Sequence, residues 1–199
     1  MSVVAQPGVS SLAKRKALKP SAAGAKRFDL IPPAEGGIEF VNRFAGLELY
    51  KNMVAHNDAG VAVGDVNGDV LTDIYFCYIQ GGNALYLNQV NFRFRLANQT
   101  AGVSEEDKMS TGSVLADVDN DGDKDLLVNG IQSGTRLFLN DGSGGFQLSE
   151  ISGLDSAGTT SSLALAEING DLFDISATGD AATPTSDYHL AGDHASWKK

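Results

Sequence analysis

Short runs of β-branched and aromatic residues recur along the middle of the chain, separated by segments rich in glycine, asparagine and aspartate. The first three runs are Val61-Ala62-Val63, Ile74-Tyr75-Phe76 and Ala84-Leu85-Tyr86-Leu87. Each run is too short for a typical helix, and turn residues lie on both sides of it. The pattern therefore predicts short β-strands joined by tight connections.

The whole pattern repeats along the chain. An acidic loop begins at Asp65, again 52 residues later at Asp117, and again 50 residues later at Glu167. The segments after the loops also correspond, since Asn83–Asn88 matches Thr135–Asn140. In the second copy, four strands are predicted, at 113–118, 125–129, 136–140 and 146–150. A period of about 50 residues with four strands is typical of a propeller blade.

The predicted fold class is all-β, with propeller-type blades of four antiparallel strands. About two and a half repeats fit into the chain, which predicts an incomplete propeller, because propellers typically have four to eight blades. The lead-in is expected to hold a strand at Ile38–Val41. The predicted organisation is a disordered basic leader (1–27), a lead-in strand and connector (28–59), repeat 1 (60–112), repeat 2 (113–161), a truncated repeat 3 (162–177) and a disordered tail (178–199).

The acidic loops have the spacing of a divalent-cation site. In the second loop, carboxylates alternate from Asp117 to Asp125, and Gly122 at position six allows a sharp turn. Calcium takes six to eight oxygen ligands, and acids at positions one, three, five and nine can converge on it, with a backbone carbonyl from position seven. The candidate ligands are Asp65, Asn67, Asp69, Leu71 and Asp73 in the first loop, Asp117, Asp119, Asp121, Asp123 and Asp125 in the second, and Glu167, Asn169, Asp171 and Asp174 in the third.

Charge and spacing rank the three loops. The second has four acidic ligands and its glycine, whereas the first has Asn67 among its ligands and Val70 at position six. In the third, Asp174 arrives one residue early. We expect calcium affinity to fall in that order. The EF-hand alternative requires a glutamate at position twelve and flanking helices, but Phe76 and Val128 occupy that position between strand-like runs.

These residues resemble the FG-GAP/VCBS repeat family, whose signature is a Gly-Asp-x-[Asn/Asp]-x-Asp-Gly-x-x-Asp loop followed by an Asn-x-Leu-Tyr-Leu-Asn-like segment. The resemblance extends over roughly residues 28–176 and is best at Gly60–Phe76 and Ala116–Val128. It implies calcium-binding blades of a β-propeller, as in integrin α-chain heads and in secreted or surface-anchored bacterial proteins. An extracellular or cell-surface location is implied in the same way, although no intact signal peptide is seen.

Composition narrows the functional classes. A formal net charge of -10 argues against a nucleic-acid partner, and no apolar run is long enough for a membrane helix. No nucleophile motif accompanies the three histidines, so the chain is not predicted to be an enzyme. The expected function is a calcium-binding scaffold for a protein or glycan ligand. A propeller segment of a calcium-dependent, lyase-like enzyme acting on polysaccharides is the alternative, and a homo-oligomer that completes the propeller is a further expectation.

Overall fold

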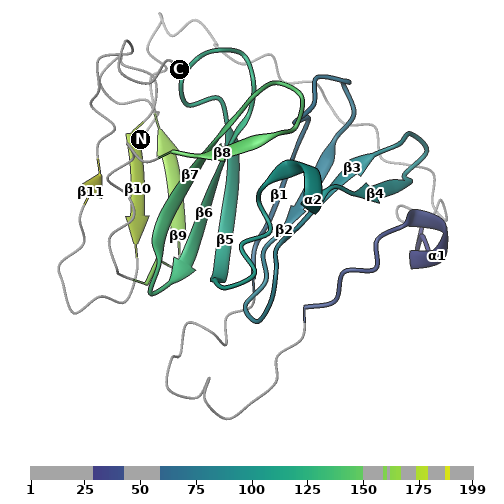
Figure 1. Ribbon diagram of the computed structural model, residues 1–199, viewed down its shortest axis with the longest axis horizontal. Helices are drawn as coiled ribbons and strands as arrows, with labels where there is room; N and C mark the ends of the chain where they lie inside the picture. The colour runs from purple at the N-terminus through teal and green to yellow at the C-terminus, as the bar shows by residue number, and fades with distance from the viewer. Residues whose placement is uncertain are drawn as a thin grey trace, which may run out of the picture. The chain divides into compact units, whose positions relative to one another are not determined.

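The computed structural model describes residues 29–42, 59–149, 159–160, 162–166, 174–178 and 187–188. The chain divides into two units, residues 1–31 and 32–199, and all of the helices and strands reported below belong to the second unit. Within the described ranges the secondary structure is almost entirely β (Figure 1). The predicted all-β fold class is confirmed.

The first repeat forms one antiparallel sheet in which neighbouring strands are also consecutive in sequence. Its strands are β1 (Val61–Gly64), β2 (Asp73–Phe76), β3 (Ala84–Asn88) and β4 (Phe94–Leu96). Burial alternates along β2, where Asp73 and Tyr75 are buried and Ile74 and Phe76 are partly exposed. This period of two shows that one face of the sheet is covered more fully than the other.

The second repeat forms an equivalent four-stranded sheet, as predicted. Its strands are β5 (Met109–Ala116), β6 (Asp125–Ile131), β7 (Gly134–Asn140) and β8 (Phe146–Leu148). β5 begins before the predicted start of the repeat at residue 113, with a register irregularity between Ser110 and Gly112. All residues of β6 are buried, in contrast to β2. The second sheet is therefore covered on both faces.

The third repeat forms a sheet of three described strands, ordered β11-β10-β9. These are β9 (Ser162–Ala166), β10 (Asp174–Thr178) and β11 (Asp187–Tyr188). The range 178–199 that was predicted to be disordered contains Thr178, the last residue of β10, and both residues of β11, so the prediction is wrong at these three residues. Thr178 pairs with Ser162 of β9, and β11 pairs with Ser176 and Ile175 of β10; sheet pairing can order a short segment whose own sequence gives little signal.

The lead-in differs from the prediction. The helix α1 (Pro33–Gly36) forms there, and residues 37–42 contain no strand. Proline at the first helical position and Gly37 in the left-handed conformation (φ 76°) suit the start and end of a short helix. Phe40, which was expected in a strand, instead stacks on Phe76 of β2 with ring centroids 4.9 Å apart.

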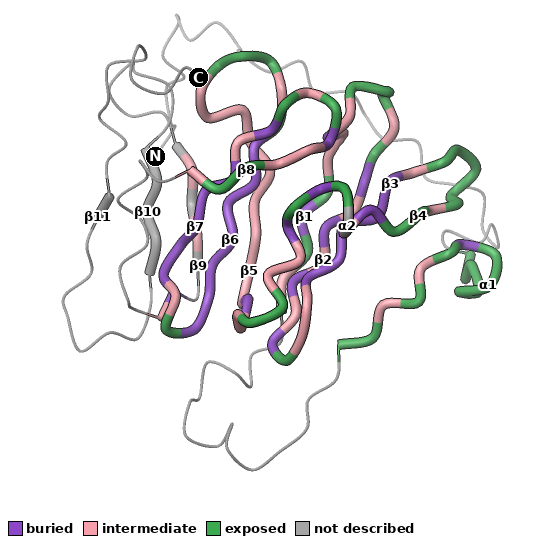
Figure 2. Tube along the Cα trace, in the orientation of Figure 1, coloured by how far each residue is buried: buried purple, intermediate pink, exposed green. Residues whose placement is uncertain are grey.

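The first two sheets share one hydrophobic core. Buried side chains from the first sheet, including Tyr75 and Leu85, pack in the same cluster as Leu126, Val128 and Phe138 of the second. Figure 2 shows the corresponding buried stretches on β2, β3, β6 and β7. A second cluster joins the other face of the second sheet, through Leu127 and Leu137, to the third sheet. The sheets therefore pack face against face in sequence order.

The backbones of the first two sheets also approach closely at one end. The Gly60 N–H donates to the Thr111 carbonyl (2.9 Å), and the Ser110 N–H donates to the Tyr78 carbonyl (2.9 Å). A Cβ atom on Gly60 would lie 2.8 Å from Gly112 Cα, so this approach requires glycine. Among the helices that the structure describes, none is long and apolar enough to cross a membrane.

Candidate metal centre

Two acidic loops occupy equivalent places in the first two sheets. Loop 1 (65–73) joins β1 to β2, and loop 2 (117–125) joins β5 to β6. Each loop ends on an aspartate that begins the next strand, opposite the last residue of the preceding strand. Asp73 pairs with Gly64, and Asp125 pairs with Ala116. The sheet register therefore fixes the position-nine carboxylate of each loop.

The position-nine carboxylates of Asp73 and Asp125, the closing carboxylates, are buried and hydrogen-bonded in the same way. Asp73 is 0% and Asp125 1% exposed. Asp125 Oδ2 accepts from the Val118 N–H (2.9 Å), and its Oδ1 accepts from the Asn140 N–H (2.9 Å). Asp73 accepts equivalent bonds from Val66 and Asn88 (3.0 and 2.8 Å). Burial raises the pKa of Asp73, and it raises that of Asp125 to about 6. Backbone hydrogen bonds thus hold both carboxyl groups in place. A nearby cation would stabilise their ionised form, which burial disfavours.

Loop 2 brings three carboxylates together. One oxygen from each of Asp117, Asp119 and Asp125 lies within 4.8 Å of the other two. Burial, and then the charge of Asp121, raises the pKa of Asp119. Asp117 Oδ1 is buried and accepts no hydrogen bond from any described residue. A buried carboxylate oxygen without a partner is costly, and a hard divalent cation would supply the missing interaction. The residues of loop 2 therefore fit a metal ion.

The two remaining acids of loop 2 lie outside this three-carboxylate group. Asp121 is exposed, and its Oδ1 accepts from the Asp123 N–H (3.0 Å). Asp123 is partly buried. Of the five predicted loop 2 ligands, the structure places three close together, and the predicted contribution of the Asp123 carbonyl stays a prediction.

The carboxylates of Asp65 and Asp69 accept hydrogen bonds from within loop 1. Asp65 Oδ1 accepts from the backbone N–H groups of Asn67 and Gly68, and its Oδ2 accepts from that of Val70 (3.2, 2.9 and 2.8 Å). Asp69 accepts from the Asn67 side-chain amide (3.1 Å) and from the Leu71 N–H (2.8 Å). Within the described ranges, the loop 1 acids do not meet as a group that could hold a metal ion. Because Asn67 is neutral, it adds no negative charge to loop 1, and its side-chain amide donates a hydrogen bond to Asp69 instead.

The third loop falls almost wholly outside the described residues. This holds for Glu167, Asn169 and Asp171. Asp174 is described as the first residue of β10, and it pairs with Ala166, the last residue of β9. It therefore has the same backbone register as Asp73 and Asp125, although its loop is one residue shorter. The register of the closing aspartate is thus the same in all three sheets.

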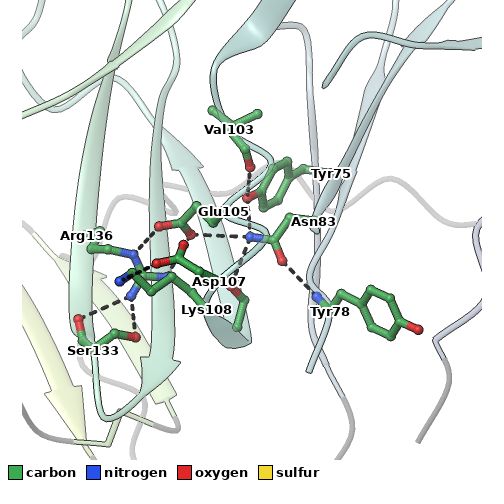
Figure 3. Close-up of polar contacts among 10 residues, drawn as sticks. Tyr75, Tyr78, Asn83, Val103, Glu105, Asp107, Lys108, Ser133 and Arg136 are labelled. Carbon is green, nitrogen blue, oxygen red and sulfur yellow. Dashed lines mark hydrogen bonds and ion pairs between the residues drawn. The ribbon is translucent and has the colours of Figure 1, made fainter. Parts of the chain in front are cut away.

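A buried polar network between the first two sheets was missed in the sequence (Figure 3). Arg136 Nε and Nη2 donate to the two carboxylate oxygens of Glu105, the latter at 2.7 Å. The side chains are 7% and 9% exposed, respectively. Asn83 Nδ2 donates to Tyr75 Oη (2.7 Å) and to Glu105 Oε2 (3.3 Å). The available signal was Arg136 itself, because it is a charged residue within an apolar strand. The partner of Arg136 cannot be read from the sequence.

Sequence reasoning also missed the asparagines that hold the closing aspartates. Asn88 and Asn140 each end the third strand of a sheet, and each donates its backbone N–H to the closing carboxylate that lies 15 residues earlier. Their recurrence at the end of the matched segments was visible, but its structural meaning was not. These residues complete the loop framework.

Repeated four-stranded antiparallel sheets, each with an acidic loop between its first two strands, define a β-propeller-type repeat module. The family model of the FG-GAP-like repeat matches residues 65–128 and 117–174, and the chain belongs to that family. The resemblance stated from the loop residues is thus confirmed. A search of curated proteins gave no significant match.

Proposed function

We propose that this chain is a non-catalytic, calcium-stabilised repeat module whose principal ion site is loop 2. The observation that carries the proposal is the group of Asp117, Asp119 and Asp125, in which one buried carboxylate oxygen has no hydrogen-bond partner among the described residues. A bound cation would relieve the repulsion among these groups and interact with that oxygen. The ion's role is to hold the β5–β6 connection.

The donor set favours calcium over other divalent ions. All of the candidate side-chain donors in loop 2 are oxygens, which hard cations prefer, and calcium tolerates irregular coordination better than magnesium does. Zinc usually requires histidine or cysteine. The single cysteine, Cys77, is buried, and burial raises the pKa of its thiol to about 12. It therefore cannot supply a thiolate at neutral pH.

Calorimetric titration and thermal unfolding with calcium chloride or a chelator test the proposal. Saturation at about 100 times the dissociation constant should stabilise the folded state by about 2.7 kcal/mol for each site. Asp119→Ala should lower the calcium affinity of loop 2 at least tenfold. Asp107→Ala removes an exposed acid outside the loops and serves as the matched control. Absence of both calorimetric binding and thermal stabilisation in the wild type would contradict the proposal.

We propose further that the module acts outside the cell and binds a protein or glycan ligand. The family resemblance supports this location. An open pocket of about 320 Å³ supports a small polar ligand, because its lining includes Thr100, Asp141, Phe146 and Gln147, which offer hydroxyl, carboxylate, amide and aromatic groups. Glycan-array binding of the labelled protein tests the glycan arm, with Gln147→Ala as the pocket variant. Detection of the protein in medium or in cell lysate tests the location.

A further inference from the structure

The turn between β7 and β8, residues 141–145, approaches loop 2 at Gly142. This glycine is in the left-handed conformation (φ 78°). A Cβ atom on Gly142 would lie 2.5 Å from Asp123 Oδ2 and 3.1 Å from Asp123 Cγ. The carboxylate of Asp123 therefore occupies the space that a side chain at residue 142 would need. Glycine in the turn allows Asp123 to keep this position.

Asn140, the last residue of β7, holds the end of loop 2. Its backbone N–H donates to Asp125 Oδ1 (2.9 Å), and its side-chain Nδ2 donates to the Lys124 carbonyl (3.0 Å). Its Oδ1 accepts from the Gly142 N–H (3.1 Å), and the residue is 3% exposed. A buried amide that is engaged in this way keeps one orientation, because each lost bond leaves an unpaired polar group. Asn140 thus fixes the end of loop 2 relative to the turn.

Loop 1 supports the turn from its other side. Asn140 Nδ2 also donates to the Val66 carbonyl of loop 1 (2.9 Å). A Cβ atom on Gly144 would lie 3.5 Å from Asn67 Cβ, which is an ordinary van der Waals contact. Hydrogen bonds from within loop 1 hold the acids of that loop. The turn therefore packs on a loop with a fixed shape, and close packing of this kind resists displacement.

The equivalent turn of the first sheet, residues 89–93, has no such arrangement with its own loop. Val90 corresponds to Gly142, because each lies two residues after the asparagine that ends the third strand. Val90 keeps the left-handed conformation (φ 65°) and is 53% exposed. Position seven of loop 1 is Leu71, where loop 2 has Asp123. The turn glycine and the position-seven aspartate thus occur together in the sheet whose loop gathers three carboxylates.

We infer that Asn140 and Gly142 are positioning residues that hold loop 2 in the shape that binds the ion. This inference rests on the proposed calcium binding at loop 2. Gly142 leaves room for the Asp123 carboxylate, and Asn140 fixes Asp125 through the bonds to Asp125 itself and to the preceding residue. Ligands that are held before the ion arrives lose less conformational freedom on binding, so the calcium affinity of loop 2 is higher.

Calorimetric titration of the full chain with calcium chloride tests the role of Gly142. The control is Gly144→Ala, because Gly144 lies in the same turn with a similar backbone (φ 83°) and has only ordinary contacts. Gly142→Ala should weaken calcium binding about tenfold, as is typical of residues that orient metal ligands, and Gly144→Ala should leave it unchanged. In an Asp123→Ala background, Gly142→Ala should have no further effect, because the carboxylate that it displaces is then absent.

The matched pair of Asn140→Ala and Asn88→Ala tests the role of Asn140. Asn88 ends the third strand of the first sheet, and its Nδ2 donates to the Thr72 carbonyl (3.0 Å), away from loop 2. Asn140→Ala should weaken calcium binding about tenfold, and Asn88→Ala should leave it unchanged. A purely structural Asn140 would lower the free energy of unfolding in chelator but leave the dissociation constant of the folded protein unchanged. Urea unfolding in chelator is therefore measured beside the titration.

The contrary outcomes separate this inference from the proposed function. If the wild type binds calcium and Gly142→Ala binds it as tightly as Gly144→Ala, the positioning role of Gly142 is overturned and the proposed function stands. Equal affinities in Asn140→Ala and Asn88→Ala overturn the role of Asn140 in the same way. If the wild type does not bind calcium, the proposed function and the inference both fail. Where one of the two positioning variants does not fold, the other decides the inference.

Discussion

Loops 1 and 2 have the same backbone conformation at two key positions but distribute glycine differently. Position four is left-handed in both, at Gly68 (φ 74°) and Asn120 (φ 60°), and so is position six, at Val70 (φ 67°) and Gly122 (φ 99°). In each loop the first aspartate accepts from the N–H of position six, at 2.8 Å in loop 1 and 3.1 Å in loop 2. The hydrogen bonds therefore set the loop shape. Glycine only lowers the conformational free energy that a left-handed residue costs.

The two loops differ more in charge than in shape. Loop 1 pairs Asp69 with the Asn67 amide, whereas loop 2 has Asp119 at the equivalent of Asn67 and gathers three carboxylates. The same framework thus supports a self-satisfied turn in one sheet and a candidate ion site in the next. The comparison extends to the sheets themselves, since Arg136 of the second sheet corresponds to Ala84 of the first.

The largest expected effect on the free energy of unfolding concerns Arg136, whose equivalent in the first sheet is Ala84. Glu105→Ala should lower the free energy of unfolding by about 3–5 kcal/mol, because it leaves Arg136 charged, buried and unpaired. Urea unfolding measures the change. Replacing both partners, as Glu105→Leu with Arg136→Leu, should cost less than Glu105→Ala, since no charge then remains buried. A double variant that is less stable than Glu105→Ala would contradict this explanation.

The next effect concerns the closing carboxylate of loop 2. In ion-free protein, burial raises the pKa of Asp125 from 3.8 to about 6. The folded state therefore binds this proton more tightly, and the stability that Asp125 contributes is greatest near pH 4 and falls as the pH rises to about 6. The expected change is on the order of 2 kcal/mol. Urea unfolding in chelator from pH 4 to 7 measures it.

Asp125→Asn is the control for that pH dependence, because it removes the titrating group while keeping the side-chain size. The difference in unfolding free energy between the wild type and Asp125→Asn should vary between pH 4 and 6 and be flat above pH 7. Saturating calcium should reverse the slope, since the ion binds the ionised carboxylate. A pH-independent difference in chelator would show that Asp125 titrates normally.

Exchanging the position-six residues of the two loops should give smaller and opposite changes. A β-branched residue in the left-handed region costs about 1–2 kcal/mol, and glycine loses about 0.5–1 kcal/mol through backbone entropy. Val70→Gly should therefore stabilise by about 0.5–1 kcal/mol, and Gly122→Val should destabilise by a similar amount. Gly122 has open space where a Cβ would be, so conformation alone sets this cost. Thermal unfolding in chelator measures both, and changes of the same sign would contradict a common loop shape.

Much of this architecture was predictable because it depends on local sequence patterns. The repeat period and the alternating apolar runs predicted both four-stranded sheets, and the acid spacing located the three carboxylates of loop 2. The strand expected at Ile38–Val41 failed because alternation alone does not supply a pairing partner, and Phe40 stacks on Phe76 instead.

The relations between sheets were not predictable from the sequence. The bond from Asn140 to Val66 joins residues 74 positions apart, and the pair of Glu105 and Arg136 spans 31. No local spacing encodes such contacts. Position four of the loops was missed for a different reason, because asparagine tolerates the left-handed conformation and Asn120 gave no glycine signal.

The smallest expected effect concerns the less covered face of the first sheet. Val63 is 61% exposed, whereas its equivalent in the second sheet, Leu115, packs against the core that the two sheets share. Val63→Glu should change the stability of the isolated chain by less than about 0.5 kcal/mol, as is usual for exposed sites, and Leu115→Glu should cost several times more. Urea unfolding at low protein concentration compares the two variants.

The same pair tests whether a second copy of the chain covers that face, as the predicted homo-oligomer requires. Val61, Val63, Ile74 and Phe76 share this face by register, and it corresponds to the face of the second sheet that packs on the first. If the chain self-associates there, light scattering should show an assembly that Val63→Glu abolishes and that Val70→Glu, equally acidic but outside the sheet, retains. An assembly insensitive to Val63→Glu would place the contact elsewhere, and a wild-type monomer at every concentration would reject the homo-oligomer.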